Sequence, residues 1–177
     1  MRHADFAAAL YILTIPSYHP APMLRTDAKW LDLRQINERE EFLAGQVSTV
    51  AMARLQATLT RLTPTVEADL RLRREQGVII AQGEVRLDGL IQCQRCLGDM
   101  PLLLAAPVRS GIAASETLIT RLDQSLEPVL VEGDRLELAA WIEDEILLSL
   151  PIAPICTAWD GGVCPVSGVE PATPATE

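Results

Sequence analysis

The stretch VEADLRLR, residues 66–73, decides the fold, because apolar and charged side chains alternate along it without interruption. A period of two is typical of a β-strand that lies half-buried in a sheet. Gln76-Gly77 follows as a turn, and residues 78–91 continue as a second strand. Gly83 and Gly89 interrupt this second strand and predict that it is bent.

A C-x-x-C motif, Cys93 and Cys96, follows the second strand. Residues 97–99 then reverse the chain, and alternating apolar side chains over 102–108 predict the return strand. The motif is therefore expected at the tip of a β-hairpin. Gly98 stands two residues after the second thiol, where a positive φ would turn backbone N–H groups toward thiolates.

A helical segment is expected before the strands. Asn37 is a possible N-cap, and glutamates in the turn after it complement the positive end of a helix dipole. Apolar residues from Val47 to Leu59 keep a helix-like spacing, and Thr63-Pro64 ends the segment. Gly45 is a residue inside this segment that disfavours a helix.

The C-terminal third predicts a short strand over 128–131 and then a helix. Asp134 and Glu137 have the spacing of a capping box, and the helix should run from there to Leu150. Its predicted apolar face consists of Leu138, Trp141, Ile142 and Leu148. Glu145 falls on that face and is interpreted as a carboxylate that reaches water; the alternative is a buried carboxylate paired with Arg95.

These elements predict an α+β fold: a curved antiparallel β-sheet with an N-terminal helical segment and a C-terminal helix packed on it. We expect a single domain over 23–168, a disordered tail over 169–177, and an extension over 1–22 that is disordered or precedes the true start at Met23. No apolar run reaches the roughly 18 to 20 residues that cross a bilayer, and no signal-peptide cleavage site follows the first apolar run. A cytoplasmic protein is expected.

The net charge of −9 is unevenly distributed, because residues 101–177 carry the acidic excess and the rest is balanced. A uniformly basic footprint for nucleic acid is therefore absent. Contact with RNA would be local, or indirect through a basic protein that the acidic segment attracts. The candidate contact residues are Arg71, Arg73, Arg74, Arg86 and Arg95. A plain solvated sheet face is the alternative for the strand arginines.

The four cysteines form two pairs, Cys93 with Cys96 and Cys156 with Cys164. In a reducing compartment such thiols serve metal binding or redox chemistry more often than disulfides. Four thiolates suit tetrahedral zinc, which makes all four residues candidate zinc ligands. Small buried side chains and a redox pair are the alternatives, although a redox C-x-x-C normally begins a helix.

No arrangement of residues for catalysis is visible in the sequence. The only histidines, His3 and His19, lie in the N-terminal extension, so a nucleophile elsewhere has no histidine base. Neither a phosphate-binding loop nor a dinucleotide-binding glycine motif is present. The protein is therefore expected not to be an enzyme.

Three short segments resemble the YceD family, also known as domain of unknown function 177: QCQRCL at 92–97, WIEDEI at 141–146 and LPIAP at 150–154. The resemblance covers roughly residues 31–168. It implies a cytoplasmic ribosome-biogenesis factor that supports accumulation or processing of 23S ribosomal RNA and assembly of the large subunit. The implied partners are the large-subunit precursor, 23S rRNA, or the small basic ribosomal protein often encoded beside family members.

The C-terminal segment departs from the family's cysteine pattern. Many members carry C-x3-C-x3-C-P-x-C-G after the L-P-x-x-P segment, whereas this chain has Asp160 and Ser167 at two of those cysteine positions. Either Cys93 and Cys96 complete a tetrahedron with Cys156 and Cys164, or Asp160 contributes an oxygen, or the site is a metal-free relic. A thiol-based redox or zinc-binding protein that uses the C-x-x-C pair is the alternative function.

Overall fold

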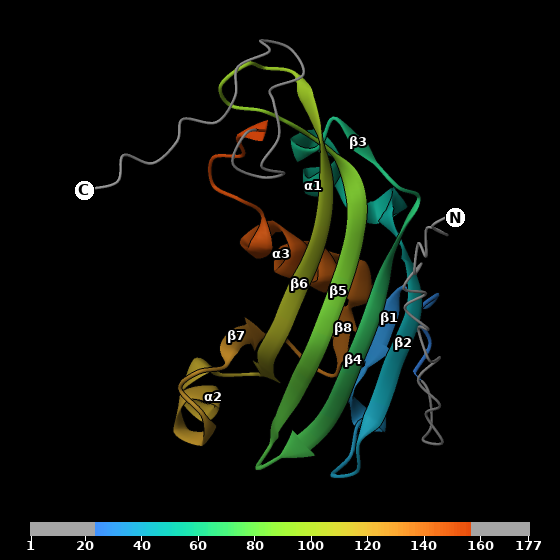
Figure 1. Cartoon of the computed structure of the whole chain (residues 1–177). Coiled ribbons are helices and arrows are strands. Elements are labelled where there is room, and N and C mark those ends of the chain that lie inside the picture. The colour runs from blue at the N-terminus through green and yellow to red at the C-terminus, as the bar shows by residue number, and fades with distance from the viewer. Residues whose placement is uncertain (1–23, 157–177) are drawn as a thin grey trace, which may run out of the picture.

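A long β-hairpin forms the centre of the fold in a computed structural model, which describes residues 24–156. Its strands are β5 (Val78–Gln92) and β6 (Asp99–Ala113), and β4 (Thr65–Glu75) pairs with β5 on the other side. The turn at Gln76 and Gly77 has positive φ at both residues, as a tight two-residue hairpin turn requires. The predicted strands and turn are confirmed (Figure 1).

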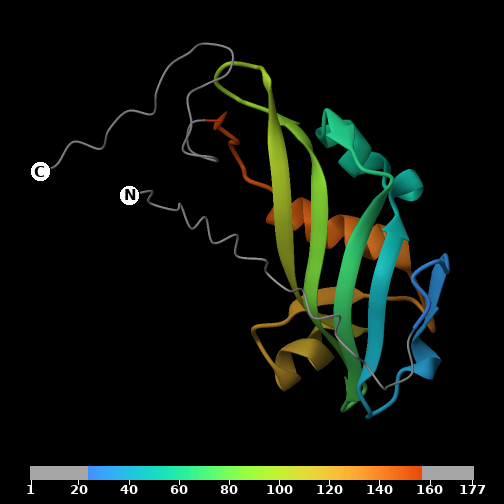
Figure 2. The ribbon, with the colours of Figure 1, turned by 45° about the vertical axis from the view of Figure 1, so that its right-hand side comes forward.

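The sheet has the order β2-β4-β5-β6-β7 and is visibly curved (Figure 2). β2 (Glu41–Ser48) is antiparallel to β4, and β7 (Glu127–Leu130) is parallel to β6. β3 (Arg61–Leu62) pairs with β5 away from this path. A separate two-stranded ladder joins β1 (Trp30–Asp32) to β8 (Arg135–Glu137). The predicted α+β class with a curved, mostly antiparallel sheet is confirmed.

Gly83 allows β4 and β5 to approach closely where β5 bends. A Cβ at this position would lie 2.1 Å from the carbonyl oxygen of Asp69, and its φ of 150° is rare for residues with side chains. Only glycine fits there.

Helix α3 (Leu138–Ser149) packs across one face of the sheet (Figure 2). Leu138, Trp141 and Ile142 are buried as predicted, but Leu148 is 74% exposed, and Ile146 completes the apolar face instead. Leu148 lies at the edge of the apolar stripe of the helix, so its side chain points to solvent although Trp141 beside it is buried. The largest fully buried side chains between the sheet and this helix include Leu43, Leu70, Leu72, Leu87, Met100 and Leu102.

The predicted helix over 37–63 is wrong in its first half. Residues 41–48 form β2, because pairing with β4 along eight residues outweighs the local helix signals. Asn37 accepts a hydrogen bond from the N–H of Arg39 and forms a turn instead of a helix cap. The helical part is limited to η2 (Thr49–Ala51) and α1 (Ala53–Thr58).

The predicted capping box at Asp134 is also wrong. The residues after Asp134 form β8, and α3 begins at Leu138, although its predicted end is confirmed. Two short elements were not predicted, η1 (Leu33–Gln35) and α2 (Glu116–Leu122). Ile119 is the buried residue of α2, so the sequence shows no repeating apolar pattern there.

The predicted extension over 1–22 and the predicted tail over 169–177 lie outside the described residues. Between residues 24 and 156, no helix is long and apolar enough to cross a membrane.

Candidate metal centre

The tip of the β5–β6 hairpin positions the C-x-x-C motif. The Cys93 N–H donates to the carbonyl of Gly98 at 2.9 Å, and the Leu97 N–H donates to the carbonyl of Cys93 at 2.9 Å. Leu97, with φ of 59°, adopts the left-handed conformation that was predicted for Gly98. This conformation costs a leucine roughly 1 to 2 kcal/mol, so the closed tip is held against a local preference.

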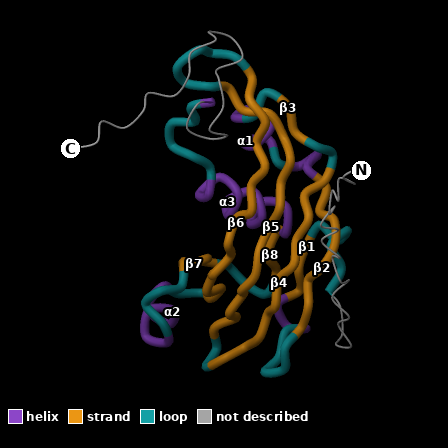
Figure 3. The backbone as a smooth tube through the Cα atoms, in the orientation of Figure 1, coloured by secondary structure: helices purple, strands orange, loops and turns teal. Residues whose placement is uncertain are grey.

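The segment after α3 returns toward the hairpin tip (Figure 3). It carries Cys156, whose sulfur joins those of Cys93 and Cys96. Pro151 and Pro154 extend the chain beyond the helix, and the carbonyl of Pro154 accepts a hydrogen bond of 2.8 Å from the N–H of Gln94. Two residues later, the N–H of Cys156 lies 3.5 Å from the sulfur of Cys93. The hairpin tip and the C-terminal segment therefore form one site.

The sulfur atoms of Cys93, Cys96 and Cys156 all lie within 4.8 Å of one another, and those of Cys93 and Cys156 are 3.8 Å apart. All three are reduced thiols; Cys93 and Cys156 are buried and Cys96 is half-buried. Thiolates bound to zinc at about 2.3 Å in a tetrahedron lie about 3.8 Å apart. The distance between Cys93 and Cys156 therefore equals the edge of a zinc tetrahedron, and Cys96 lies close enough to be a third ligand. We refer to these residues as the thiol cluster.

Backbone N–H groups of Cys96 and Cys156 lower the pKa of the Cys93 thiol to about 6, although burial opposes this shift. At neutral pH this sulfur is therefore mainly a thiolate. A thiolate is the form that binds metal ions and that attacks electrophiles. The electrostatics of the tip thus favour metal binding or thiol chemistry over simple packing.

The other predicted metal ligands, Cys164 and Asp160, lie outside the described residues, as does Ser167. The structure brings together three of the four cysteines. The identity of the fourth ligand stays a prediction.

The strand arginines share their face of the sheet with carboxylates. Arg71 lies between Phe42 of β2 and Gln82 of β5, and Arg86 pairs with Glu67 in the register of β4 and β5. Ion pairs join Arg86 to Glu84 at 2.7 Å and Arg73 to Glu75. The face therefore has mixed charge.

The remaining candidate arginines lie elsewhere. Arg74 donates hydrogen bonds to the carbonyl oxygens of Leu33 and Ile36, so it holds the segment before β2. Arg95 is exposed at the hairpin tip, next to the thiol cluster. Whether any of these arginines contacts RNA stays a prediction.

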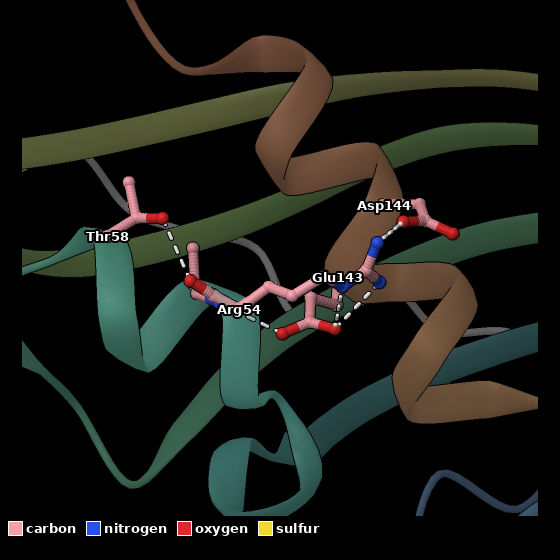
Figure 4. A network of polar contacts seen from close by, with 5 residues as sticks. Arg54, Thr58, Glu143 and Asp144 are labelled. Carbon is pink, nitrogen blue, oxygen red and sulfur yellow. Dashed lines mark hydrogen bonds and ion pairs between the residues drawn. The ribbon is translucent and has the colours of Figure 1, made fainter.

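Sequence reasoning missed an ion-pair network between α1 and α3 (Figure 4). Buried Glu143 accepts hydrogen bonds from the Leu55 N–H at 2.9 Å and from the Arg54 guanidinium at 2.7 and 3.0 Å. Arg54 also pairs with exposed Asp144 at 2.6 Å. No local pattern predicts this network, because Glu143 and Arg54 are 89 residues apart.

Burial alone would raise the pKa of Glu143. Hydrogen bonds from the Leu55 N–H and from Arg54 outweigh burial and leave this pKa below its usual value. The carboxylate of Glu143 therefore caps the first turn of α1 from a different helix.

The interpretation of Glu145 as a carboxylate that reaches water is wrong. The residue is 6% exposed, and its Oε1 atom accepts hydrogen bonds from Trp141 Nε1, at 2.8 Å, and from the Ser110 hydroxyl. Its partners are thus these two residues and not Arg95. Its position among apolar residues was the signal for burial in the sequence.

These features define an α+β protein with a buried thiol cluster and structural carboxylates. A family model described as "Large ribosomal RNA subunit accumulation protein YceD" matches residues 81–176, more than half of the chain. The chain belongs to the YceD family. Searches of curated proteins and of solved structures give no match.

Proposed function

We propose that this protein is a non-enzymatic, cytoplasmic factor that supports accumulation or processing of 23S rRNA and assembly of the large ribosomal subunit. The family match over residues 81–176 carries this proposal, because the description of the family names accumulation of large-subunit ribosomal RNA. The matched segment contains most of the central hairpin, α3 and the thiol cluster.

Two observations support a role without catalysis. Both oxygens of buried Glu143 accept hydrogen bonds from Leu55 and Arg54 within the fold, and the sequence after residue 19 contains no histidine that could act as a base. A general acid or base needs an atom that is free to exchange a proton with the substrate, and neither oxygen of Glu143 is free.

The implied partners are the large-subunit precursor, 23S rRNA, or a small basic ribosomal protein. The mixed charge around Arg71, Arg73 and Arg86 gives little attraction for a phosphate backbone, whereas the acidic C-terminal part complements a basic protein. These charges favour the protein partner. Arg95 at the tip is the arginine best placed for a local RNA contact.

The test is the ratio of 23S to 16S rRNA in cells that lack the gene, with and without a plasmid that carries it. We expect a selective fall in 23S rRNA that the plasmid restores. An unchanged ratio at several growth temperatures would refute the proposal.

We also infer that Cys93, Cys96 and Cys156 hold a structural zinc ion, with Cys164 or Asp160 as the fourth ligand. The sulfur spacing and the lowered pKa of Cys93 support this assignment. A bound zinc ion would cross-link the hairpin tip to the C-terminal segment. The residues of the chain supply the buried thiolates and the backbone N–H groups that stabilise their charge.

The metal content of the full chain, measured by mass spectrometry after purification without chelators, tests this inference. We expect zinc in the unmodified protein, loss of zinc in Cys93→Ser, and reduced zinc in either Cys164→Ser or Asp160→Ala. Ser167→Ala is the matched control and should keep zinc. Metal-free protein whose thiols react rapidly with alkylating reagents would instead favour the redox alternative.

A further inference from the structure

A groove of about 570 Å³ lies between β7 and α3, away from the thiol cluster. Its apolar lining includes Val129 and Leu130 from the strand and Trp141 and Leu148 from the helix. Leu130 and Leu148 are 59% and 74% exposed. β7 is the last strand of the sheet, so within the described part of the chain its outer backbone edge pairs with no strand (Figure 1).

The groove is acidic. Four carboxylates line it, Glu127, Glu137, Asp144 and Glu145, and the single basic residue of the lining is Arg54. Arg54 is already paired with Glu143 and Asp144, and Glu137 lies 3.8 Å from Lys29. Glu127 and Glu145 have no basic partner among residues 24–156. The potential in the groove therefore favours a cation.

Glu145 is the buried carboxylate of this lining. The residue is more than nine-tenths buried, and both of its hydrogen bonds fall on Oε1. Within residues 24–156, Oε2 of this carboxylate receives no hydrogen bond. A buried carboxylate oxygen normally has a donor, so Oε2 can accept a hydrogen bond from a basic group that enters the groove.

We propose that this groove binds a peptide segment of a partner protein in which a lysine or arginine stands between apolar side chains. The basic group pairs with Glu145, the apolar side chains pack against Leu130 and Leu148, and the peptide backbone lies along the open edge of β7. Addition of an extended peptide to a sheet edge is a common mode of peptide recognition. Phosphates of a nucleic acid would be repelled by the same carboxylates. The inference stands independently of the role in rRNA accumulation.

The probe is a fluorescein-labelled peptide of alternating lysine and leucine, titrated with the full chain and followed by fluorescence anisotropy. Peptides of alternating glutamate and leucine, and of alternating lysine and serine, test the charge and the apolar contribution. We expect each control peptide to have a Kd at least about tenfold higher, because it lacks either the basic or the apolar side chains that contact the groove.

Two variants with matched controls locate the site. Glu145→Gln and Leu148→Ser should each weaken binding about tenfold. Glu132→Gln removes an exposed charge outside the groove lining, and Leu103→Ser removes a leucine that is 73% exposed on another strand. Neither control should change binding. Because Leu148 is 74% exposed, we expect its replacement to leave the fold intact, which keeps the test valid if Glu145→Gln unfolds the protein.

The proposal is overturned by equal affinity for all three peptides, by absence of binding, or by equal effects of the groove and control variants. Displacement of the peptide by single-stranded RNA would assign the groove to nucleic acid and overturn it too. A dimer without peptide that Leu148→Ser dissociates would assign the groove to a second copy of the chain, with the same consequence.

Discussion

The hairpin tip and helix α3 both bury ionisable groups, but they satisfy them in different ways. At the tip, three sulfurs converge on one point, and backbone N–H groups lower the pKa of Cys93 to about 6. On α3, Glu143 and Glu145 point to different parts of the fold, and each accepts hydrogen bonds from its own set of donors.

This difference is the one expected between a candidate metal site and a structural contact between two helices. Thiolates that converge repel one another and need a cation between them, whereas a carboxylate surrounded by donors is already satisfied. Glu143 belongs to the second kind, because it fixes α1 onto α3. Glu145 is intermediate, with one oxygen bound by the fold and the other without a donor from residues 24–156.

Removal of the zinc ion proposed at the thiol cluster should have the largest effect on stability. A cross-link between Cys93 and Cys156 closes a loop of 63 residues, and such a constraint on the unfolded chain contributes about 4 kcal/mol. We expect a chelator to lower the free energy of unfolding by about this amount, measured by urea denaturation of the full chain. Cys93→Ser should be insensitive to the chelator. An unchanged urea midpoint in the unmodified protein would show that the tip is stable without a metal.

Replacement of Glu143 tests the contact that holds α1 against α3. Glu143→Ala should cost about 2 to 4 kcal/mol, because it leaves the Leu55 N–H without its acceptor and removes the buried partner of Arg54. The matched control is Asp144→Ala, which removes an exposed partner of the same arginine and should cost less than about 1 kcal/mol. If urea denaturation gives the two variants equal losses in the free energy of unfolding, buried Glu143 contributes no more to stability than exposed Asp144.

The contribution of the Glu143 carboxylate to stability should depend on pH. Its pKa is lower in the folded protein than in the unfolded chain, so its contribution is complete above the unfolded value of about 4.3. The contribution is lost as the pH falls through the folded pKa. We expect the unmodified protein to lose more stability than Glu143→Gln between neutral pH and strongly acidic pH. Parallel curves for the two proteins would contradict this prediction.

The smallest effect concerns reactivity and leaves stability unchanged. In protein freed of metal, Cys93 should reach half of its maximal alkylation rate near pH 6, well below the value of about 8.5 for an ordinary thiol. Mass spectrometry of peptides after brief iodoacetamide treatment measures this rate for each cysteine. A midpoint above pH 8 would mean that the backbone N–H groups do not stabilise the Cys93 thiolate.

The sequence predicted the central hairpin and the position of Cys93 and Cys96, because strict alternation and a turn are local signals. It failed at residues 41–48. There the local helix signals, which are the possible cap at Asn37 and the apolar spacing that begins at Val47, are outweighed by pairing between β2 and β4. Strand pairing of this kind depends on a partner that is distant in sequence, so no window along the chain contains the deciding information.

The same limit applied to the two buried sites. The four cysteines could be recognised as candidate ligands, but the convergence of Cys156 on Cys93 depends on the path of α3 across the sheet. Glu143 gave no signal at all, because its partner Arg54 is 89 residues away in the sequence and lies on a different helix. The chemical nature of residues was thus easier to predict than their partners.

The separation of the thiols along the chain also sets a time order during synthesis. Cys93 and Cys96 are made before Cys156, and at typical translation rates the interval of 63 residues lasts on the order of 3 to 12 s. Throughout this interval the nascent hairpin can offer a metal only two of the three clustered thiols. The cluster closes once α3 and the segment after it have been made, so its assembly marks the point at which the sheet and its covering helix are both complete.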